Sequence, residues 1–465
     1  MLEVNILAIH LNSTSNILMP KPIIIKKEIK KFDKKIKVDG DKSLSIRFAL
    51  LASQAIGKSK ANNLLKSEDV VSTINCLKKL GVKIIWDKKK NFCEIYGNGL
   101  NSFAYKDNLI LDGKNSGTCV RLLTSLLINS SKKIKIVGDK SLSKRDMKRI
   151  IDPLSEFGAT FYPKYRNTLP LYVKGTDNLT PINYIESKGS SQCKSSVMLA
   201  ALLSPGQTKI KCKHSRNHTE LLFKYLKIPI KIKKGRNFDI IKIKGKKNFN
   251  SFNYNIPSDI SSSAFFIVLT LLSKNSKIVL EKVGVNDSRI GVVTILNKMG
   301  AKIKLKNKKK YKGEKIADIH VRSSNSLKSI NCSKKLNSSA IDEFLIIFLA
   351  AARAKGVSYF KNLEELNKKE SKRLDWGSKI LSMIGVKNQI INNHSIKIWG
   401  QPNLKLNKNI EIKNYLKDHR VMAMSSIAAL TLGGKWKIHD PDSIKTSFPS
   451  FFKIIKFLGG RYEVN

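Results

Sequence analysis

The chain has 465 residues, of which 42% are hydrophobic and 26% are charged. This length exceeds what one hydrophobic core usually supports, so we expect two or three domains, and the composition excludes a wholly disordered chain. The net charge of +52 favours contact with nucleic acid. However, the lysines are spread along the whole chain without a nucleic-acid-binding motif, so we expect solvated lysines and only nonspecific contact with polyanions.

The cysteines show neither a CxxC pair nor the Cys/His spacing of a zinc site. They are Cys76, Cys93, Cys119, Cys193, Cys212 and Cys332. We expect reduced thiols in the cytoplasm, with Cys119 and Cys193 as small buried side chains. We also expect a monomer that needs no metal and no cofactor. No apolar stretch reaches membrane-spanning length. Residues 1–36 lack a clear signal-peptide pattern and are left as a leader of uncertain status.

The first predicted element follows an eight-residue pattern that occurs twice, at Gly40–Arg47 and at Gly138–Arg145. Each copy has a glycine turn, a Lys-Ser pair where a helix could begin, and an arginine one turn later. Free N–H groups at a helix start bind anions together with nearby cations. Two copies therefore predict a substrate with more than one anionic group.

Helical patterns that end in a glycine and run into a strand recur at intervals of about 75 residues. The glycines are Gly81, Gly158, Gly300, Gly385 and Gly459, with Leu226–Pro229 as a degenerate member. One such junction is ordinary in any α/β protein, because glycine supplies the left-handed cap. Six at similar spacing predict repeated helix–strand units, three in each of two similar domains. We place one crossing before Ile256–Ser262 and the other near Val38–Gly40.

Three further helix starts carry polar residues. Gly113–Thr118 precedes a predicted helix at Val120–Leu127, which has Arg121 on its first turn, and Gly189–Gln192 precedes one at Lys194–Leu202. Small residues in the first segment allow a ligand close to the backbone, although an ordinary N-cap explains that pattern equally well. The second segment adds neutral hydrogen-bond donors. Asp342 and Glu343 open the apolar helix Phe344–Ala352. Such acids usually complement the helix dipole, but one that faces a cationic pocket could accept a proton.

The last two clusters are strongly charged. In Lys368–Arg373, a carboxylate lies among cations, and Lys369 and Arg373 would share one face of a helix. Like charges at that spacing repel unless an anion lies between them, but an exposed charged turn is the simpler explanation. Asp418–Arg420 leads into a predicted helix at Val421–Leu432. His419 alone is more often structural than catalytic.

Taken in order, these motifs resemble the 5-enolpyruvylshikimate-3-phosphate (EPSP) synthase family from about Lys37 to Gly459. The matching segments include Gly40–Ser43 with Arg47, Asn115–Thr118 with Arg121, Ser143–Arg145, Ser190–Ser195, Ser215–Glu220, Asp259–Ser262, Lys369–Ser371 with Arg373, Asp418–Arg420 and Thr446–Pro449. The resemblance implies an α/β fold of two similar domains, each with three βαβαββ units around a pseudo-threefold axis. The domains would be 37–39 with 256–465, and 40–255, with the active site in the cleft between them.

The reaction implied by the resemblance transfers the enolpyruvyl group of phosphoenolpyruvate to the 5-hydroxyl of shikimate 3-phosphate, through a tetrahedral intermediate. Shikimate 3-phosphate would be bound by Lys42, Ser43, Arg47, Ser190, Ser191, Gln192, Ser215, Asp342 and Lys369. Phosphoenolpyruvate would be bound by Lys42, Asn115, Gly117, Arg145, Gln192, Arg373 and Arg420. Asp342 would lie near the 5-hydroxyl, Glu370 would transfer the proton at the enolpyruvyl carbon, and Lys42 would serve as cation and acid.

The sequence departs from the family pattern at a few positions. Asp39 and Lys372 replace a proline and an aspartate, and Thr446 stands where some members have a phosphate-binding lysine, next to Lys445. The nearest rival is a sister transferase that acts on UDP-N-acetylglucosamine with a catalytic cysteine, and Cys119 does not match its motif. A nucleic-acid-binding protein on the same scaffold is a second alternative, but a phosphate-backbone binder gains nothing from carboxylates such as Asp342 and Glu370 in its basic cleft.

Overall fold

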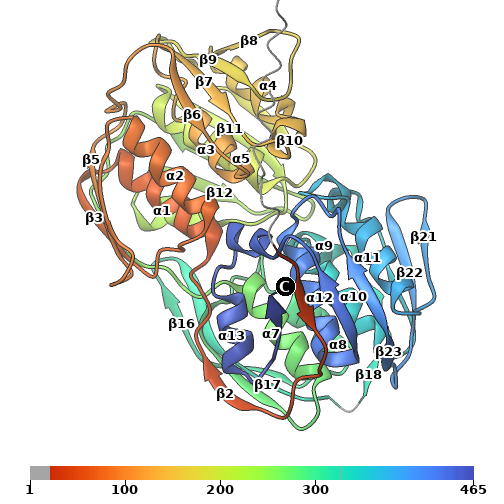
Figure 1. Cartoon of the computed structure of the whole chain (residues 1–465). Coiled ribbons are helices and arrows are strands. Elements are labelled where there is room, and N and C mark those ends of the chain that lie inside the picture. Colours follow the sequence, from red (N-terminus) through yellow and green to blue (C-terminus); the bar gives the residue numbers. More distant parts are fainter. Residues whose placement is uncertain (1–20, 325, 465) are drawn as a thin grey trace, which may run out of the picture.

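The computed structural model describes residues 21–324 and 326–464. Two separate hydrophobic cores divide these residues. One core combines residues from 23–38 and 260–458, and we call this half the lower body, after its place in Figure 1. The other core is drawn from 44–256 and forms the upper body. The chain therefore enters and leaves the upper body once.

The six described sheets share one topology: a parallel pair, followed by two strands that are each antiparallel to their neighbour. In the upper body the strand orders are β14 (Asn253–Asn255), β3 (Ile56–Asn62), β5 (Phe92–Asn98), β4 (Lys83–Asp87); β6 (Leu109–Asp112), β7 (Lys133–Val137), β9 (Leu171–Lys174), β8 (Thr160–Tyr162); and β10 (Asn183–Glu186), β11 (Gln207–Lys213), β13 (Phe238–Lys244), β12 (Ile230–Lys233).

The lower body repeats this arrangement. Its strand orders are β2 (Asp33–Ile36), β15 (Lys277–Gly284), β17 (Glu314–Arg322), β16 (Ile303–Tyr311); β18 (Leu327–Lys328), β20 (Ala354–Phe360), β22 (Ser395–Gly400), β21 (Asn388–Ile391), with β19 (Asn331–Cys332) also on β20; and β23 (Leu406–Ile412), β24 (Gly433–Ile438), β1 (Ile23–Ile25), β25 (Glu463–Val464).

Each unit contributes one buried helix and one helix that is apolar on one side only. The buried helices are α1 (Lys42–Gln54), α3 (Gly117–Thr124), α5 (Ser191–Leu203), α7 (Ile260–Leu272), α10 (Phe344–Ala352) and α12 (His419–Leu432). The others are α2 (Glu68–Lys79), α4 (Lys148–Glu156), α6 (His218–Tyr225), α8 (Gly291–Lys298), α11 (Arg373–Met383) and α13 (Phe451–Phe457). Every residue of α10 is buried, as expected for a helix that is hydrophobic all round. The four predicted helices that carried site motifs are confirmed.

Four 3-10 turns, η1 (Leu142–Lys144), η2 (Lys334–Leu336), η3 (Glu364–Lys368) and η4 (Pro441–Thr446), and the short helix α9 (Asn337–Ala340) complete the described elements.

The six predicted helix ends are confirmed, and each closes the second helix of a unit. The five glycines have φ between +79° and +112°. In each case, the residue after the left-handed position donates its N–H to a carbonyl five residues earlier, for example Val82 to Leu77. This is the Schellman cap that glycine favours. The degenerate member adopts the same cap without glycine, with Lys227 at φ +57°.

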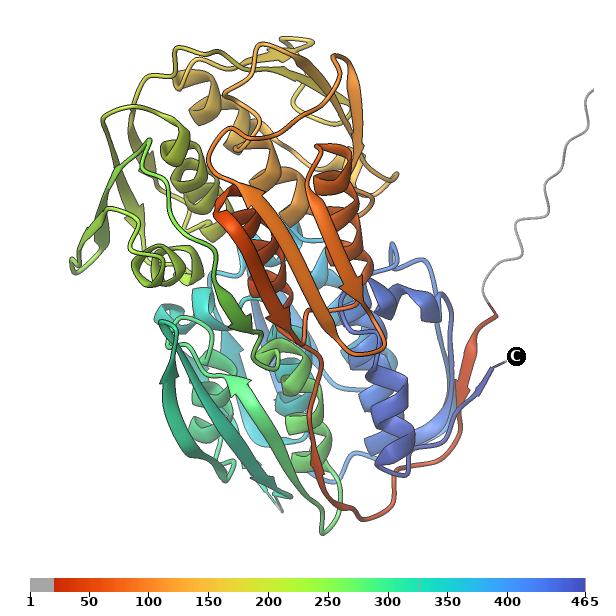
Figure 2. The same ribbon diagram turned by 90° about the vertical axis from the view of Figure 1, so that its left-hand side faces the viewer.

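Two connections link the bodies, and they run side by side (Figure 2). The Asp41 N–H donates to the carbonyl of Pro257 (2.8 Å), and the Asp259 N–H donates to that of Asp39 (3.0 Å). The first connection leads from β2 into α1, and the second leads from β14 into α7. Asp41 and Asp259 are the N-caps of those two helices, so the connections also fix the helix starts.

Residues 23–36, which the sequence analysis left within a leader of uncertain status, belong to the sheets of the lower body. Strand β1 lies between β24 and β25, with Ile23 and Ile25 buried, and β2 pairs with β15. Strand β1 thus completes the last unit. Residues 1–20 of the expected leader lie outside the described residues. Among the helices described, none combines the length and apolar character needed to cross a membrane.

Candidate active site

The N-termini of the buried helices meet where the two bodies face each other. The Lys42 N–H of α1 lies 3.3 Å from Asp259 Oδ2 at the start of α7. Ser261 donates to Glu343, which caps α10, and Arg420 of α12 lies 3.8 Å from that same carboxylate. Each N-terminus carries the positive end of a helix dipole, so this boundary favours bound anions.

Lys42 connects the two bodies. Its Nζ lies 2.8 Å from Asp69 Oδ2 of the upper body and 2.8 Å from Ser447 Oγ of the lower body. Thr446, in contrast, donates its hydroxyl to the Ser443 carbonyl, and the exposed Lys445 pairs with Asp442 (2.7 Å). Ser447 therefore lies at Lys42, while Thr446 and Lys445 are engaged elsewhere.

Arg47 is a buried cation whose hydrogen bonds go to uncharged groups. It is 4% exposed, and it donates to Thr219 Oγ1 (2.8 Å), Ser195 Oγ (2.9 Å) and the Ser43 carbonyl (3.2 Å). Burial lowers the pKa of Arg47 to about 10, against the opposing effect of Glu220, so it stays charged at neutral pH. A buried guanidinium with no carboxylate bonded to it is suited to an anionic ligand.

Ser190 and Ser191 begin α5 beside this region. Ser190 is the N-cap, and its hydroxyl accepts the N–H of Cys193 (3.3 Å). Ser215 Oγ is buried without a hydrogen-bond partner in the described structure. An unpartnered buried hydroxyl costs free energy unless a ligand satisfies it.

Asp342 lies among three cations. Its Oδ2 lies 2.6 Å from Arg216 Nη2, and its Oδ1 lies 3.3 Å from Lys369 Nζ and 3.4 Å from Arg373 Nη1. Burial acts to raise the pKa of Asp342, but these cations and Arg420 hold it well below its ordinary value. The anion expected between Lys369 and Arg373 is thus a side chain of the protein. The two cations do not share a helix face, because α11 begins only at Arg373.

Glu370 forms an ion pair with Arg373 and lies 4.0 Å from Arg145 Nη1 of the upper body. Burial acts to raise the pKa of Glu370, but Arg373, Arg145, His419 and Lys42 hold it well below its ordinary value. Arg373 also binds Asp418 through two bonds, Nε–Oδ2 (2.8 Å) and Nη2–Oδ1 (3.1 Å). Both catalytic candidates of the lower body are therefore anionic at neutral pH.

A second group of cations surrounds Gly117. Arg145 Nη2 donates to Asn115 Oδ1 (2.7 Å), and Arg121 Nη1 donates to Gln192 Oε1 (2.6 Å). A Cβ atom at Gly117 would lie 3.1 Å from Arg121 Nη1 and 3.2 Å from Arg145 Nη1. The glycine lets both guanidiniums approach the start of α3.

The two copies of the eight-residue pattern differ in structure, and the predicted second helix start is wrong. Asp41 Oδ1 accepts the Leu44 N–H (2.8 Å), and Asp139 Oδ1 likewise accepts the Leu142 N–H (2.7 Å). The first copy continues as α1, but the second forms only η1, and α4 begins later, at Lys148. The shared sequence thus specifies the turn. A helix follows only in the first copy, because in the second copy Arg145 is extended and ends the turn.

The contacts between the bodies include the predicted site residues Lys42, Arg145, Asp342 and Glu370, whereas Arg47 bonds to groups of the upper body. The structure also adds partners that were not predicted. These are Asp69, Arg121, Arg216, Asp418 and Ser447. Four of them adjoin or belong to the motifs described above. Their place in a motif could have marked them as site residues from the sequence alone. Asp69 had no such signal, because an acid in the first turn of a helix is ordinary.

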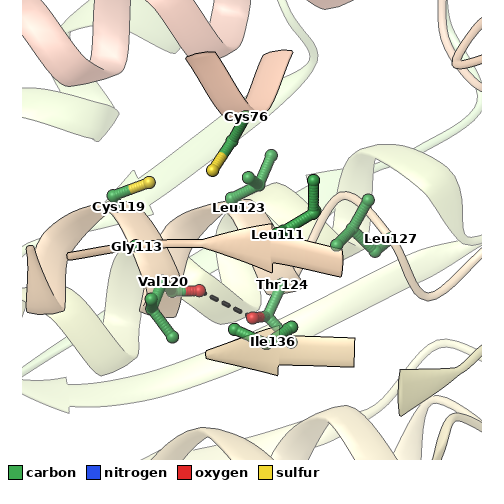
Figure 3. A pocket seen from close by; sticks show the side chains of 9 residues that line it. All are labelled: Cys76, Leu111, Gly113, Cys119, Val120, Leu123, Thr124, Leu127 and Ile136. Atoms are coloured by element: carbon green, nitrogen blue, oxygen red, sulfur yellow. Dashed lines mark hydrogen bonds between the residues drawn. The ribbon is translucent and has the colours of Figure 1, made fainter. Parts of the chain in front are cut away.

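Cys119 is fully buried and cannot face a substrate. Together with Cys76 it lines a small apolar cavity between α2 and α3 (Figure 3). Burial and the neighbouring Cys76 thiol raise the pKa of Cys119 well above its ordinary value. Its expected role as a small buried side chain is confirmed.

Comparisons with known proteins identify the family. The family model for EPSP synthase (3-phosphoshikimate 1-carboxyvinyltransferase) matches residues 26–455. The 3-phosphoshikimate 1-carboxyvinyltransferase of Ruthia magnifica is 39% identical over 425 residues, which cover 91% of this chain and 95% of the relative. That of Petrotoga mobilis is 35% identical over 424 residues, with 90% and 96% covered.

Solved structures give the same result. EPSP synthase from Acinetobacter baumannii superposes with a TM-score of 0.84 at 33% identity, covering 96% of this chain and 100% of that one. The enolpyruvyl transferase NikO from Streptomyces tendae (TM-score 0.75, 13% identity, 96% and 99% covered) shares the fold. The chain therefore belongs to the EPSP synthase family: it is a 3-phosphoshikimate 1-carboxyvinyltransferase of the shikimate pathway, with the α/β fold of the enolpyruvyl transferases.

Proposed function

We propose that the boundary between the bodies is the active site and that it divides into two subsites. Shikimate 3-phosphate lies along α1 and α5. Its carboxylate meets Ser43 and Arg47. Each nitrogen of Arg47 already donates one hydrogen bond within the protein. The remaining N–H groups can still form the two parallel bonds that suit a carboxylate. The phosphate of shikimate 3-phosphate meets the start of α5 and the nearby cation Lys369. Ser190, Ser191, Gln192 and Ser215 supply neutral hydrogen bonds.

Phosphoenolpyruvate occupies the second subsite, where cations from both bodies converge. Arg145 of the upper body and Arg373 of the lower body both reach toward Glu370. Lys42, Asn115, Gly117, Gln192 and Arg420 complete the subsite. A phosphate and a carboxylate on one small molecule can form ion pairs with several of these cations at once, in exchange for their contacts with the carboxylates of the protein.

In the reaction, C3 of phosphoenolpyruvate gains a proton, the shikimate 5-hydroxyl attacks C2, and phosphate then leaves from the tetrahedral intermediate. The low pKa of Asp342 keeps it ionised, so that it accepts a hydrogen bond from the 5-hydroxyl and orients it. It takes the proton only as the new bond to C2 forms and makes that oxygen acidic. Phosphoenolpyruvate draws Arg145 and Arg373 away from Glu370. The pKa of Glu370 then rises toward the range in which it can deliver and recover a proton at C3, while Lys42 supplies charge and a second source of protons.

One observation carries this proposal: each of the two candidate catalytic carboxylates of the lower body lies against an arginine of the upper body. Asp342 meets Arg216, and Glu370 meets Arg145. The site is therefore complete only when the bodies are together, which favours the two expected domains, 37–39 with 256–465 and 40–255, that close over substrate. Strands β1 and β2 extend the first of these domains back to Ile23. Every proposed residue comes from one chain, so a monomer suffices. The buried free thiols fit the reducing cytoplasm.

Calorimetric titration with shikimate 3-phosphate tests the division into subsites. We expect Arg47→Ala to abolish measurable binding, because it removes the cation of the first subsite. Arg145→Ala is the matched control, and it should bind shikimate 3-phosphate as the wild type does while its KM for phosphoenolpyruvate rises at least about tenfold. Equal losses of shikimate 3-phosphate affinity in both variants would contradict the assignment.

A further inference from the structure

Besides the buried contacts of His218 with Glu314 and of Arg289 with Asp41, a partly exposed ion pair joins the two bodies outside the proposed subsites. Arg149, in the first turn of α4, donates Nη1 to Glu365 Oε2 (3.1 Å) and Nη2 to Glu365 Oε1 (3.2 Å). Arg149 belongs to the upper body, and Glu365 belongs to η3 of the lower body. The two parallel bonds form the bidentate geometry of a strong arginine–carboxylate pair.

This pair lies on the same two segments as the contact between Arg145 and Glu370. Arg149 comes shortly after Arg145 in the sequence, and Glu365 comes shortly before Glu370 on the opposing segment. The same two segments, 145–149 and 365–370, are thus joined at both ends, by Arg145–Glu370 (4.0 Å) and by Arg149–Glu365. The outer pair is more exposed: the side chain of Arg149 is 32% exposed and that of Glu365 is 36% exposed. In the inner pair, the corresponding values are 13% for Arg145 and 23% for Glu370.

We propose that Arg149 and Glu365 form a latch that holds the two bodies closed and so places Arg145 against Glu370. This inference rests on the proposed function of that inner pair. Arg149 and Glu365 are positioning residues, since they act through their neighbours and touch neither substrate. The hydrogen bond with Glu365 raises the pKa of Arg149, and although burial acts to raise the pKa of Glu365, Arg149 lowers it below its ordinary value. Both groups are charged at neutral pH.

A latch changes the fraction of closed molecules, and the apparent affinity for a ligand of the closed state scales with that fraction. A half-exposed pair contributes modestly, so we expect loss of the latch to raise the KM for phosphoenolpyruvate about threefold. Because the closed complex itself is unchanged, kcat should stay within about twofold.

The test measures phosphate release for Glu365→Gln, Arg149→Gln and the double variant. Lys368 Nζ also lies 3.2 Å from Glu365, so only the double-mutant cycle isolates the bond across the bodies. Lys148 and Asp152 give a matched control on the same helix, since they form an ion pair within the upper body (3.2 Å). Lys148→Gln and Asp152→Asn remove the same charges without touching the boundary.

We expect each single variant to raise the KM for phosphoenolpyruvate and the double variant to raise it no further. The charge swap R149E/E365R should reverse at least half of that increase in KM. The ratio of KM between Glu365→Gln and the wild type should fall toward one at about 1 M salt, because screening weakens an exposed pair. Additive effects, equal effects of Asp152→Asn, or a ratio independent of salt would each overturn the latch. An inactive wild type would instead overturn the proposed function.

Discussion

At the residue scale, the site depends on charges that are buried in pairs. Arg373 is 1% exposed and Asp418 is fully buried, and two hydrogen bonds join them. Burial acts to lower the pKa of Arg373, but Asp418 and Glu370 raise it above its ordinary value. A cation held this way cannot lose its charge, so removal of Asp418 takes away its fully buried partner and leaves only the more exposed Glu370 and Asp342 to balance it.

Asp418→Asn should therefore lower the free energy of unfolding by about 3–5 kcal/mol, measured by urea denaturation. Asp442→Asn, which breaks the exposed pair with Lys445, is the control and should cost at most about 1 kcal/mol. Equal midpoints for the two variants would contradict the account.

The same substitution predicts a pH dependence. Burial acts to raise the pKa of Asp418, and Arg373 lowers it below its ordinary value. The stability contributed by the ionised carboxylate is thus fully present above the unfolded-state pKa, about 3.9, and is lost as the pH falls through the lower folded-state value. The difference between wild type and Asp418→Asn should stay constant from pH 7 to about pH 5 and shrink only in stronger acid. A difference that shrinks between pH 7 and pH 5 would show that another group is responsible.

Gly117→Ala tests the close approach of Arg121 and Arg145. The added methyl group displaces both guanidiniums, so the KM for phosphoenolpyruvate should rise while the affinity for shikimate 3-phosphate stays unchanged. Gly284→Ala serves as control, because its Cβ would meet Pro257 at an ordinary 3.6 Å. Steady-state kinetics with each substrate varied in turn would measure both effects. Unchanged kinetics in Gly117→Ala would show that the space is not needed.

At the scale of elements, the same helix cap ends the second helix of all six units. Five caps use glycine, and the sixth places Lys227 in the left-handed region at φ +57°. A side chain with a Cβ is strained there. The regular cap explains why these boundaries could be predicted from sequence alone: the glycine acts locally and needs no distant partner.

Lys227→Gly should accordingly stabilise the protein by about 0.5–1 kcal/mol, with the strain relieved in the folded state partly offset by greater freedom in the unfolded chain. Gly385→Ala is the reciprocal test. Nothing lies within 4 Å of its Cβ position, so the backbone conformation at φ +79° alone should destabilise the variant by about 1 kcal/mol. Urea denaturation measures both changes, and the opposite signs would refute the strain argument.

Other elements depended on distant partners and were missed for that reason. Strand β1 has only three residues, and it forms because β24 and β25, from the other end of the chain, lie on either side of it. The second copy of the eight-residue pattern contains the same local signals as the first. It stops after one turn because Arg145 is in the extended region and leaves η1 for the boundary, where it meets Asn115.

At the scale of the whole molecule, two similar bodies bring opposite charges together. The motifs identified which residues matter, because glycines, arginines and acids cluster at helix starts in the sequence. Their pairing could not be predicted. Asp342 lies between Lys369 and Arg373, and Asp418 binds Arg373, only because the chain folds back on itself between these motifs. The contacts between the bodies, such as Arg216 with Asp342, required the structure.

The central claim is that Glu370, held between Arg145 and Arg373, transfers the proton during enolpyruvyl transfer. The most direct measurement is phosphate release from phosphoenolpyruvate with shikimate 3-phosphate, compared between the wild type, Glu370→Gln and the exposed control Glu364→Gln. We predict turnover in the wild type and in Glu364→Gln, and a loss of at least about a hundredfold in kcat for Glu370→Gln with an unchanged unfolding midpoint. Full activity of folded Glu370→Gln would contradict the account.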